Sequence, residues 1–203
     1  MNTLLRQILS IILIVFLFWV MFYGSFLPLV KSQQFIKARQ TQVNTLVDFD
    51  KLYGGVLGFP SPVGQDEITS NYLEMIGNII GQEKGKTQPN EAIIRPLVAS
   101  STMWAEPIIK RGAAFSFSQI IFNYANVYRD AAIALKDKAY YEKAVELYRF
   151  GLKQSPDRQI FLYSLFDLYN MTGDKENARI IGDRIVKVYK DDRVIEILKS
   201  INQ

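Results

Sequence analysis

Apolar residues are concentrated near the N-terminal end of the chain. Between Arg6 and Lys31 there are 24 consecutive uncharged residues, and almost all of them are apolar. At about 1.5 Å per residue, about 20 residues cross the roughly 30 Å hydrocarbon core of a bilayer as an α-helix. The pattern predicts a short tail and a transmembrane helix within residues 1–30, with residues 8–30 in contact with membrane lipid.

A cleaved signal peptide is the alternative interpretation of this run. The run is longer than the apolar region of a signal peptide, and Gly24-Ser25 is the nearest approach to a cleavage site. We therefore expect a retained, single-pass anchor in a cell membrane. Arg6 precedes the run, whereas Lys31, Lys37 and Arg39 come after it, so the flanking charges are nearly balanced and slightly favour a cytoplasmic C-terminal part. Because N-terminal anchors commonly export the rest of their chain, we favour an extracytoplasmic soluble part.

The pattern changes after the apolar run. Apolar residues at near-helical spacing predict a membrane-proximal helix over residues 31–53. Gly54-Gly55, Gly58 and the Phe59-Pro60-Ser61-Pro62 sequence predict that this helix ends there. Residues 31–65 are thus expected to form one helix and a Gly/Pro loop.

Residues 66–124 predict a helical packing region. Asp66-Glu67 marks the first turn of a helix, residues 81–89 a flexible linker, and Asn90 the start of the next helix, with interruptions at Pro96 and Pro107. A second uncharged window, residues 112–128, contains several Ser and Asn residues, which favours a buried or amphipathic helix over a second membrane span. No segment shows a run of alternating residues typical of a strand, so the predicted class is all-α.

The C-terminal part of the sequence repeats with a period of about 34 residues. The units 125–158 and 159–192 place large, small and aromatic residues at matching positions. The matching residues are Tyr128, Ala131-Ala132, Leu135, Ala144, Tyr148, Gly151 and Pro156 in the first unit, and Leu162, Leu165, Tyr169, Gly173-Asp174, Ala178 and Ile185 in the second. Small residues let paired helices approach closely, and Pro156 ends one unit before the next.

These two units resemble tetratricopeptide repeats (TPRs). The resemblance implies antiparallel helix pairs stacked as an α-solenoid, with residues 193–203 as a C-terminal capping helix. Phe166, Gly182 and Lys190 depart from the usual small, aromatic and proline positions, and the Lys136-Asp137-Lys138 turn lacks glycine. A generic helical bundle is the alternative. Because about three repeats are usually needed, residues 66–124 would have to complete the core.

A wider resemblance rests on the order of parts. A final spanning helix, a linking helix, the sequence of residues 61–67 opening a helix, and then TPR-like units are similar to the C-terminal tail of bacterial O-antigen ligase/polymerase-like membrane proteins. This implies surface-polysaccharide assembly as the setting. It transfers no catalytic residues, because the multi-span catalytic body of that family has no counterpart in the sequence.

Composition excludes several kinds of chemistry. The chain has no His and no Cys, so it cannot use a His-based catalytic relay, a thiolate nucleophile or a Cys/His zinc site. Lys and Arg number 24 against 20 Asp and Glu and are interspersed with them, which does not favour nucleic-acid binding.

Two further motifs have simpler explanations than catalysis. Residues 81–87 resemble a phosphate-binding P-loop, but they have one residue too few between the glycines and follow a helix. Paired acids at Asp48/Asp50, Asp66/Glu67 and Asp191/Asp192 suit helix ends. We therefore predict no catalytic residues, no metal and no cofactor.

The TPR resemblance implies a concave face that binds a protein or peptide partner. By position, this face carries six polar residues, with Ile133, Asp137, Ile160 and Met171 beside them. The six are Asn126, Arg129, Lys136, Tyr163, Asp167 and Asn170. The leading hypothesis is a membrane-anchored, non-enzymatic scaffold at the cell envelope, linked to glycan-assembly machinery. The alternative is a C-terminal tail or fragment of a multi-span glycan transferase.

Overall fold

The computed structural model describes residues 3–43, 45–112 and 116–201. Its regular elements are all helical, and these ranges contain no strand, which confirms the all-α class. The described residues form two compact units, one up to Thr69 and one from Ser70 onward.

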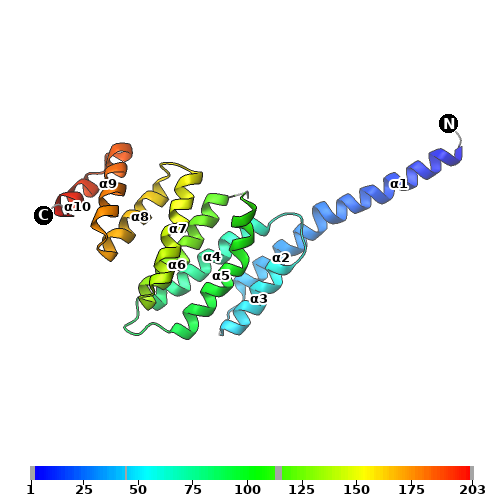
Figure 1. The fold of residues 1–203 in the computed structure, drawn as a ribbon. Helices are drawn as coiled ribbons and strands as arrows, with labels where there is room; N and C mark the ends of the chain where they lie inside the picture. Colours follow the sequence, from blue (N-terminus) through cyan, green and yellow to red (C-terminus); the bar gives the residue numbers. More distant parts are fainter. Residues whose placement is uncertain (1–2, 44, 113–115, 202–203) are drawn as a thin grey trace. The chain divides into compact units, whose positions relative to one another are not determined.

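The first helix is long and apolar enough to span a membrane. It runs without interruption from Thr3 to Gln40 as α1 (Thr3–Met21), a π-helical turn η1 (Phe22–Phe26) and α2 (Leu27–Gln40) (Figure 1). Its most apolar window of 18 residues has a mean hydropathy of 2.4, and none of that window is buried. Leu27 donates its N–H to the Phe22 carbonyl, which widens the helix just before Pro28, where a proline ring would otherwise crowd the preceding turn.

The prediction of one helix over residues 31–53 is wrong. α2 ends at Gln40, Thr41 is extended, and α3 (Leu46–Gly58) begins after Thr45. Thr45 caps α3 by accepting the Asp48 N–H at 3.1 Å, and this local hydrogen bond determines where α3 begins. The spacing of apolar residues gave no indication of this helix start. α2 and α3 then lie side by side (Figure 1).

The expected helix end is wrong for Gly54-Gly55 and right for Gly58 and the Phe59-Pro60-Ser61-Pro62 sequence. Gly54-Gly55 lies inside α3, and the helix continues to Gly58. It ends there because Pro60 disfavours a helical conformation for Phe59, whose backbone is extended.

The next two helices begin where the sequence predicts and continue further than expected. α4 (Gln65–Lys84) has Asp66 and Glu67 in its first turn, and Asn90 caps α5 (Glu91–Arg111). Residues 81–84, predicted as linker, are helical. Pro96 and Pro107 lie within α5, where they were expected to interrupt it. The buried face of α5 supplies packing that outweighs the lost backbone hydrogen bonds; it includes Ile94, Leu97, Val98, Ala105 and Ile108.

Five helices follow in series: α6 (Phe117–Leu135), α7 (Lys138–Gln154), α8 (Gln159–Thr172), α9 (Lys175–Tyr189) and α10 (Asp192–Ile201). Each packs against the next, and α5 packs against α6 (Figure 1). α6 contains residues 117–128 of the second uncharged window and is largely buried, as predicted; residues 113–115 lie outside the described residues. α10 agrees with the expected C-terminal helix as far as residue 201.

Candidate functional site

Two short turns form the same end of the α6–α7 and α8–α9 pairs. Lys136 and Gly173 end α6 and α8 in the left-handed conformation, with φ of 53° and 74°. The next residues, Asp137 and Asp174, cap α7 and α9. Asp137 accepts the N–H groups of Ala139 and Tyr140 at 3.0 and 3.4 Å, and Asp174 accepts that of Asn177 at 3.1 Å. Both turns therefore consist of a residue with a left-handed backbone followed by an aspartate that caps the next helix, although the first turn has no glycine.

A groove of about 590 Å³ lies between these two turns. Its floor is apolar, and Met171 is 63% exposed there. Charged side chains stand around it: Lys136, Asp137 and Lys138 at the first turn and Asp174 at the second. The lining residues are Ala132, Ile133, Lys136, Asp137, Lys138, Tyr141, Leu168, Met171, Thr172, Gly173 and Asp174. An apolar floor with charges of both signs suits an amphipathic peptide segment.

The six polar residues predicted for the concave face are not all in this groove. Lys136 lines it, together with Ile133, Asp137 and Met171 from the wider predicted set. Asn170 lies in the last turn of α8, and its carbonyl accepts the N–H of Gly173 at 3.2 Å, which helps to end the helix beside the groove.

Asn126 and Arg129 belong to a half-buried polar cluster on α6. Asn126 accepts the Tyr148 hydroxyl at 2.5 Å. Arg129 donates through Nε and Nη2 to Asp130 at 3.1 and 3.3 Å, and Lys84 Nζ lies 2.7 Å from the same buried carboxylate. Burial alone would lower the pKa of Arg129, but Tyr148 and Asp130 act in the opposite direction and the net shift is upward. The guanidinium is therefore a fixed positive charge between the helices.

Asp167 is exposed and lies within electrostatic range of this cluster. Loss of solvent around its carboxylate raises the pKa of Asp167, while the positive charge of Arg129 acts in the opposite direction. The two predicted residues Arg129 and Asp167 are therefore electrostatic neighbours, one on α6 and the other on α8.

Tyr163 lies elsewhere. Its hydroxyl donates to Asp191 Oδ2 at 2.7 Å, in the turn between α9 and α10. Hydrogen bonds from Arg193, and then from Tyr163, lower the pKa of Asp191 to about 2. Tyr163 is eight residues from Met171 on α8, which is about 12 Å along a helix axis. The structure thus gives Tyr163 a contact that holds the C-terminal helix turn, apart from the groove.

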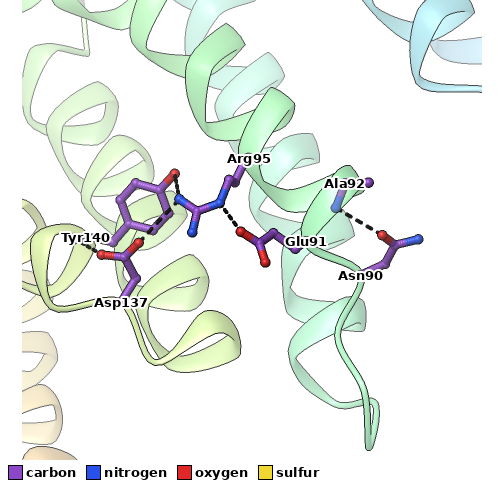
Figure 2. Close-up of polar contacts among 6 residues, drawn as sticks. All are labelled: Asn90, Glu91, Ala92, Arg95, Asp137 and Tyr140. Atoms are coloured by element: carbon purple, nitrogen blue, oxygen red, sulfur yellow. Dashed lines mark hydrogen bonds and ion pairs between the residues drawn. The ribbon is translucent and has the colours of Figure 1, made fainter.

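A contact that the sequence patterns did not predict holds one side of the groove. Figure 2 shows Arg95 of α5 reaching Asp137 and Tyr140, with Nη1 at 3.4 Å from Asp137 Oδ2 and at 3.3 Å from the Tyr140 hydroxyl. Arg95 also pairs with Glu91, which is the main cause of the raised pKa of Arg95. The four-residue spacing of Glu91 and Arg95 predicts their pairing. The contact with Asp137 joins two helices that are distant in the sequence, so it leaves no local signal.

The P-loop-like stretch has a structural role in the α4–α5 connection. Glu83 is buried, pairs with Lys86 and accepts the Asn90 N–H at 3.1 Å. The hydrogen bond from Lys86, followed by that from Asn90, lowers the pKa of Glu83. Residues 81–84 are helical, so they do not form the loop that wraps a phosphate.

Comparison with known proteins gives no match to a protein family, to a curated protein or to a solved structure. The fold itself defines the class: an all-helical protein with one N-terminal helix long and apolar enough to cross a membrane.

Proposed function

We propose that this chain is a single-pass membrane-anchored scaffold that binds a segment of a partner protein at the cell envelope. The observation that carries the proposal is the groove between the α6–α7 and α8–α9 turns, with its apolar floor and its exposed Met171. Residues 8–30 supply the anchor. The protein then acts by holding a partner near the membrane, and its groove provides binding without a chemical step.

The packing of the last helices supports a TPR-like organisation. When residues 132–164 are aligned with the residues 34 positions further along the chain, three evenly spaced positions carry side chains of opposite size. They are Ala132, Tyr148 and Ser164 in the first set, and Phe166, Gly182 and Leu198 in the second. Ser164 influences the pKa of Tyr148 and therefore lies close to its hydroxyl, and a Cβ at Gly182 would lie 2.8 Å from both Phe166 and Leu198. Both sets therefore combine small and large side chains, but the positions that are small in the first set are large in the second, and the reverse.

This exchange accounts for two departures from the TPR pattern. Phe166 occupies a position that is usually small and Gly182 one that is usually aromatic, and each compensates for the other. The two turns are separated by slightly more than one repeat, since α6 ends, and α7 begins, about one helical turn earlier than a strict period requires. We infer two TPR-like helix pairs with a displaced turn in the first.

The order of parts directs the choice of partner to test first. It is similar to that of the C-terminal tail of O-antigen ligase/polymerase-like proteins, which makes envelope glycan-assembly proteins the first candidates. If the chain is instead a piece of such a transferase, the reading frame upstream of Met1 will continue into further spanning segments, and an independent start signal there would exclude this alternative.

The groove is tested by comparing the same substitution at two exposed methionines, one inside the groove and one outside it. Met171 lies in the groove and is 63% exposed, whereas Met103 lies on α5 and is 65% exposed. Tagged full-length protein is extracted from membranes and its co-purifying proteins are identified. We expect Met171→Glu to reduce recovery of a specific partner at least tenfold and Met103→Glu to leave it unchanged. Equal recovery with both variants would reject the groove as the binding site.

A further inference from the structure

The loop between α3 and α4 is tied to the end of the apolar run. Lys31, the first charged residue after that run, is only 2% exposed. Its Nζ donates to the Phe59 carbonyl at 3.0 Å and to Gln65 Oε1. Phe59 and Gln65 flank the loop of residues 60–64, so one lysine holds both ends of the loop against the first helix.

The same loop reaches the level of residues predicted to lie in lipid. Val63 and Gly64 line a hollow of about 350 Å³ together with Pro28. Pro28 belongs to residues 8–30. Leu27, Pro28 and Val30 are partly covered, whereas each described residue from Thr3 to Phe26 is exposed. The chain therefore begins to surround the helix shortly before the apolar run ends.

The chemistry of the loop suits a water–lipid boundary. Residues 59–65 carry no charge, and Val63 is 58% exposed. Pro60 and Pro62 have no backbone N–H, and the Ser61 hydroxyl donates to the Val63 carbonyl at 2.8 Å while accepting the Val63 N–H at 3.4 Å. The two prolines and the Ser61 contact reduce the number of backbone groups that would lose water, which lowers the cost of entering a less polar medium.

We propose that residues 60–64 form a second membrane contact, in which Val63 enters the boundary between lipid headgroups and acyl chains. The proposal rests on the proposed anchoring by residues 8–30. Asp66 and Glu67 follow directly in the first turn of α4, and their charges limit the loop to the headgroup level. The anchor and the loop together fix the orientation of α2 and α3 relative to the bilayer.

The chain offers a matched control for this contact. Val47 is 76% exposed and lies at the start of α3, whereas the loop follows the end of that helix. Twelve residues separate Val47 from Phe59, which is about 18 Å along a helix axis. Both valines are in the same compact unit and both are exposed, so they differ chiefly in their distance from the predicted bilayer.

The absence of cysteine from the sequence allows single-site labelling. Val63→Cys, Val47→Cys and Phe16→Cys are each labelled with an environment-sensitive fluorophore in the full chain, reconstituted in phosphatidylcholine vesicles that contain lipids brominated near the headgroup or along the acyl chain. We expect blue-shifted emission and quenching at positions 16 and 63, with the strongest quenching of position 63 by shallow bromines, and neither effect at position 47.

The outcomes separate the two proposals. If the label at position 16 is quenched but the labels at positions 63 and 47 are both unquenched, the second contact is overturned and the anchor remains supported. Absence of quenching at position 16 would overturn the anchor and the loop contact together.

Discussion

At the scale of single residues, close packing between helices depends on glycines without room for a side chain. A Cβ at Gly151 of α7 would lie 2.4 to 2.7 Å from three ring atoms of Phe161 on α8. Heavy atoms cannot approach this closely, and an aromatic ring buried between helices has little freedom to move away. Gly151 therefore fixes how near α8 lies to α7.

Gly151→Ala is expected to lower the free energy of unfolding by about 1–3 kcal/mol through overpacking. The control is Gly77→Ala in α4, where no described atom of a neighbouring element lies within 4 Å of the added Cβ. Alanine is a better helix former than glycine, so this control substitution is expected to raise the free energy of unfolding by about 0.5–1 kcal/mol. Urea unfolding of the full chain in detergent, followed by circular dichroism, measures both. Equal effects would contradict the close contact.

The exchange of sizes at Phe166 and Gly182 predicts energetic coupling. Phe166→Ala alone is expected to cost about 3–5 kcal/mol because it leaves a cavity. Gly182→Ala alone is expected to cost about 1–3 kcal/mol because its Cβ meets Phe166 and Leu198. In the double variant the added methyl enters the space left by Phe166, so the second cost falls and a double-mutant cycle gives a coupling of about 0.5–3 kcal/mol. Strict additivity would contradict the compensation.

The sequence predicted that small residues lie between helices, but it did not predict the partners of Gly182. Alignment of the two repeat units marked Phe166 and Gly182 as two separate departures. In the structure α8 packs against α9, so that Phe166 and Gly182 are neighbours and one departure compensates for the other. A repeat period aligns positions in sequence and does not show which positions are in contact.

At the scale of helices, Asp137 combines a helix cap with a contact to α5. Asp137→Ala removes the cap of α7 and is expected to lower the free energy of unfolding by about 0.5–2 kcal/mol. Asp137→Asn keeps a good capping side chain and loses only the charge that faces Arg95, so it is expected to stay within about 1 kcal/mol of the original protein. Thermal unfolding compares the two. Equal loss would assign the effect to the ion pair.

Asp191 predicts a dependence on pH at the α9–α10 turn. The pKa of Asp191 is lowered to about 2, below its ordinary value of 3.8, mainly by the Arg193 hydrogen bond. A carboxylate with a lowered pKa stabilises the folded state above its ordinary pKa, and this contribution is lost as pH falls through the folded pKa. The unfolding midpoint of the original protein should exceed that of Asp191→Asn at neutral pH, and most of the difference should be lost as the pH approaches the folded pKa. A difference independent of pH would contradict this contribution.

Helix ends were predictable where one residue determines them and unpredictable where packing does. Asn90 marked the start of α5 correctly, because its side chain bonds within two residues. Thr45 has the same role for α3, yet regular apolar spacing across it suggested one continuous helix. Pro96 and Pro107 were expected to break α5, but burial of one face keeps that helix continuous.

At the scale of the whole molecule, the anchor is testable by extraction from membranes. Leu13 and Leu17 lie in the middle of the apolar run, where an arginine costs about 2.5–3.5 kcal/mol. The original chain is expected to remain in the membrane pellet after an alkaline carbonate wash. The double variant Leu13→Arg/Leu17→Arg is expected to be released into the supernatant. Val47→Arg is the control, and this variant is expected to remain in the pellet. Recovery of a chain that begins near Ser25 would instead identify a cleaved signal peptide.

The long apolar helix near the N-terminus could be predicted from sequence because every apolar residue contributes independently to hydropathy. The groove could not, since it depends on two turns that lie far apart in the chain. Positional analogy named Lys136 and Met171, and both line the groove. It also assigned Tyr163 to the binding face, whereas the Tyr163 hydroxyl bonds to Asp191 in a different turn. Tyr141 lines the groove and was missed, because only the first helix of each unit was expected to line the binding face, and Tyr141 lies on α7.

A photo-crosslinking experiment tests the proposed scaffold at its groove. Met171 is replaced with a photo-reactive phenylalanine derivative in the full chain, and intact membranes are irradiated. Met103, which is equally exposed on α5, is the matched control. We predict one discrete crosslinked partner from position 171, absent from position 103 and lost when Ile133→Glu is added to the groove floor. Crosslinks that are absent at position 171, or the same at both positions, would contradict a membrane-anchored scaffold that binds its partner through this groove.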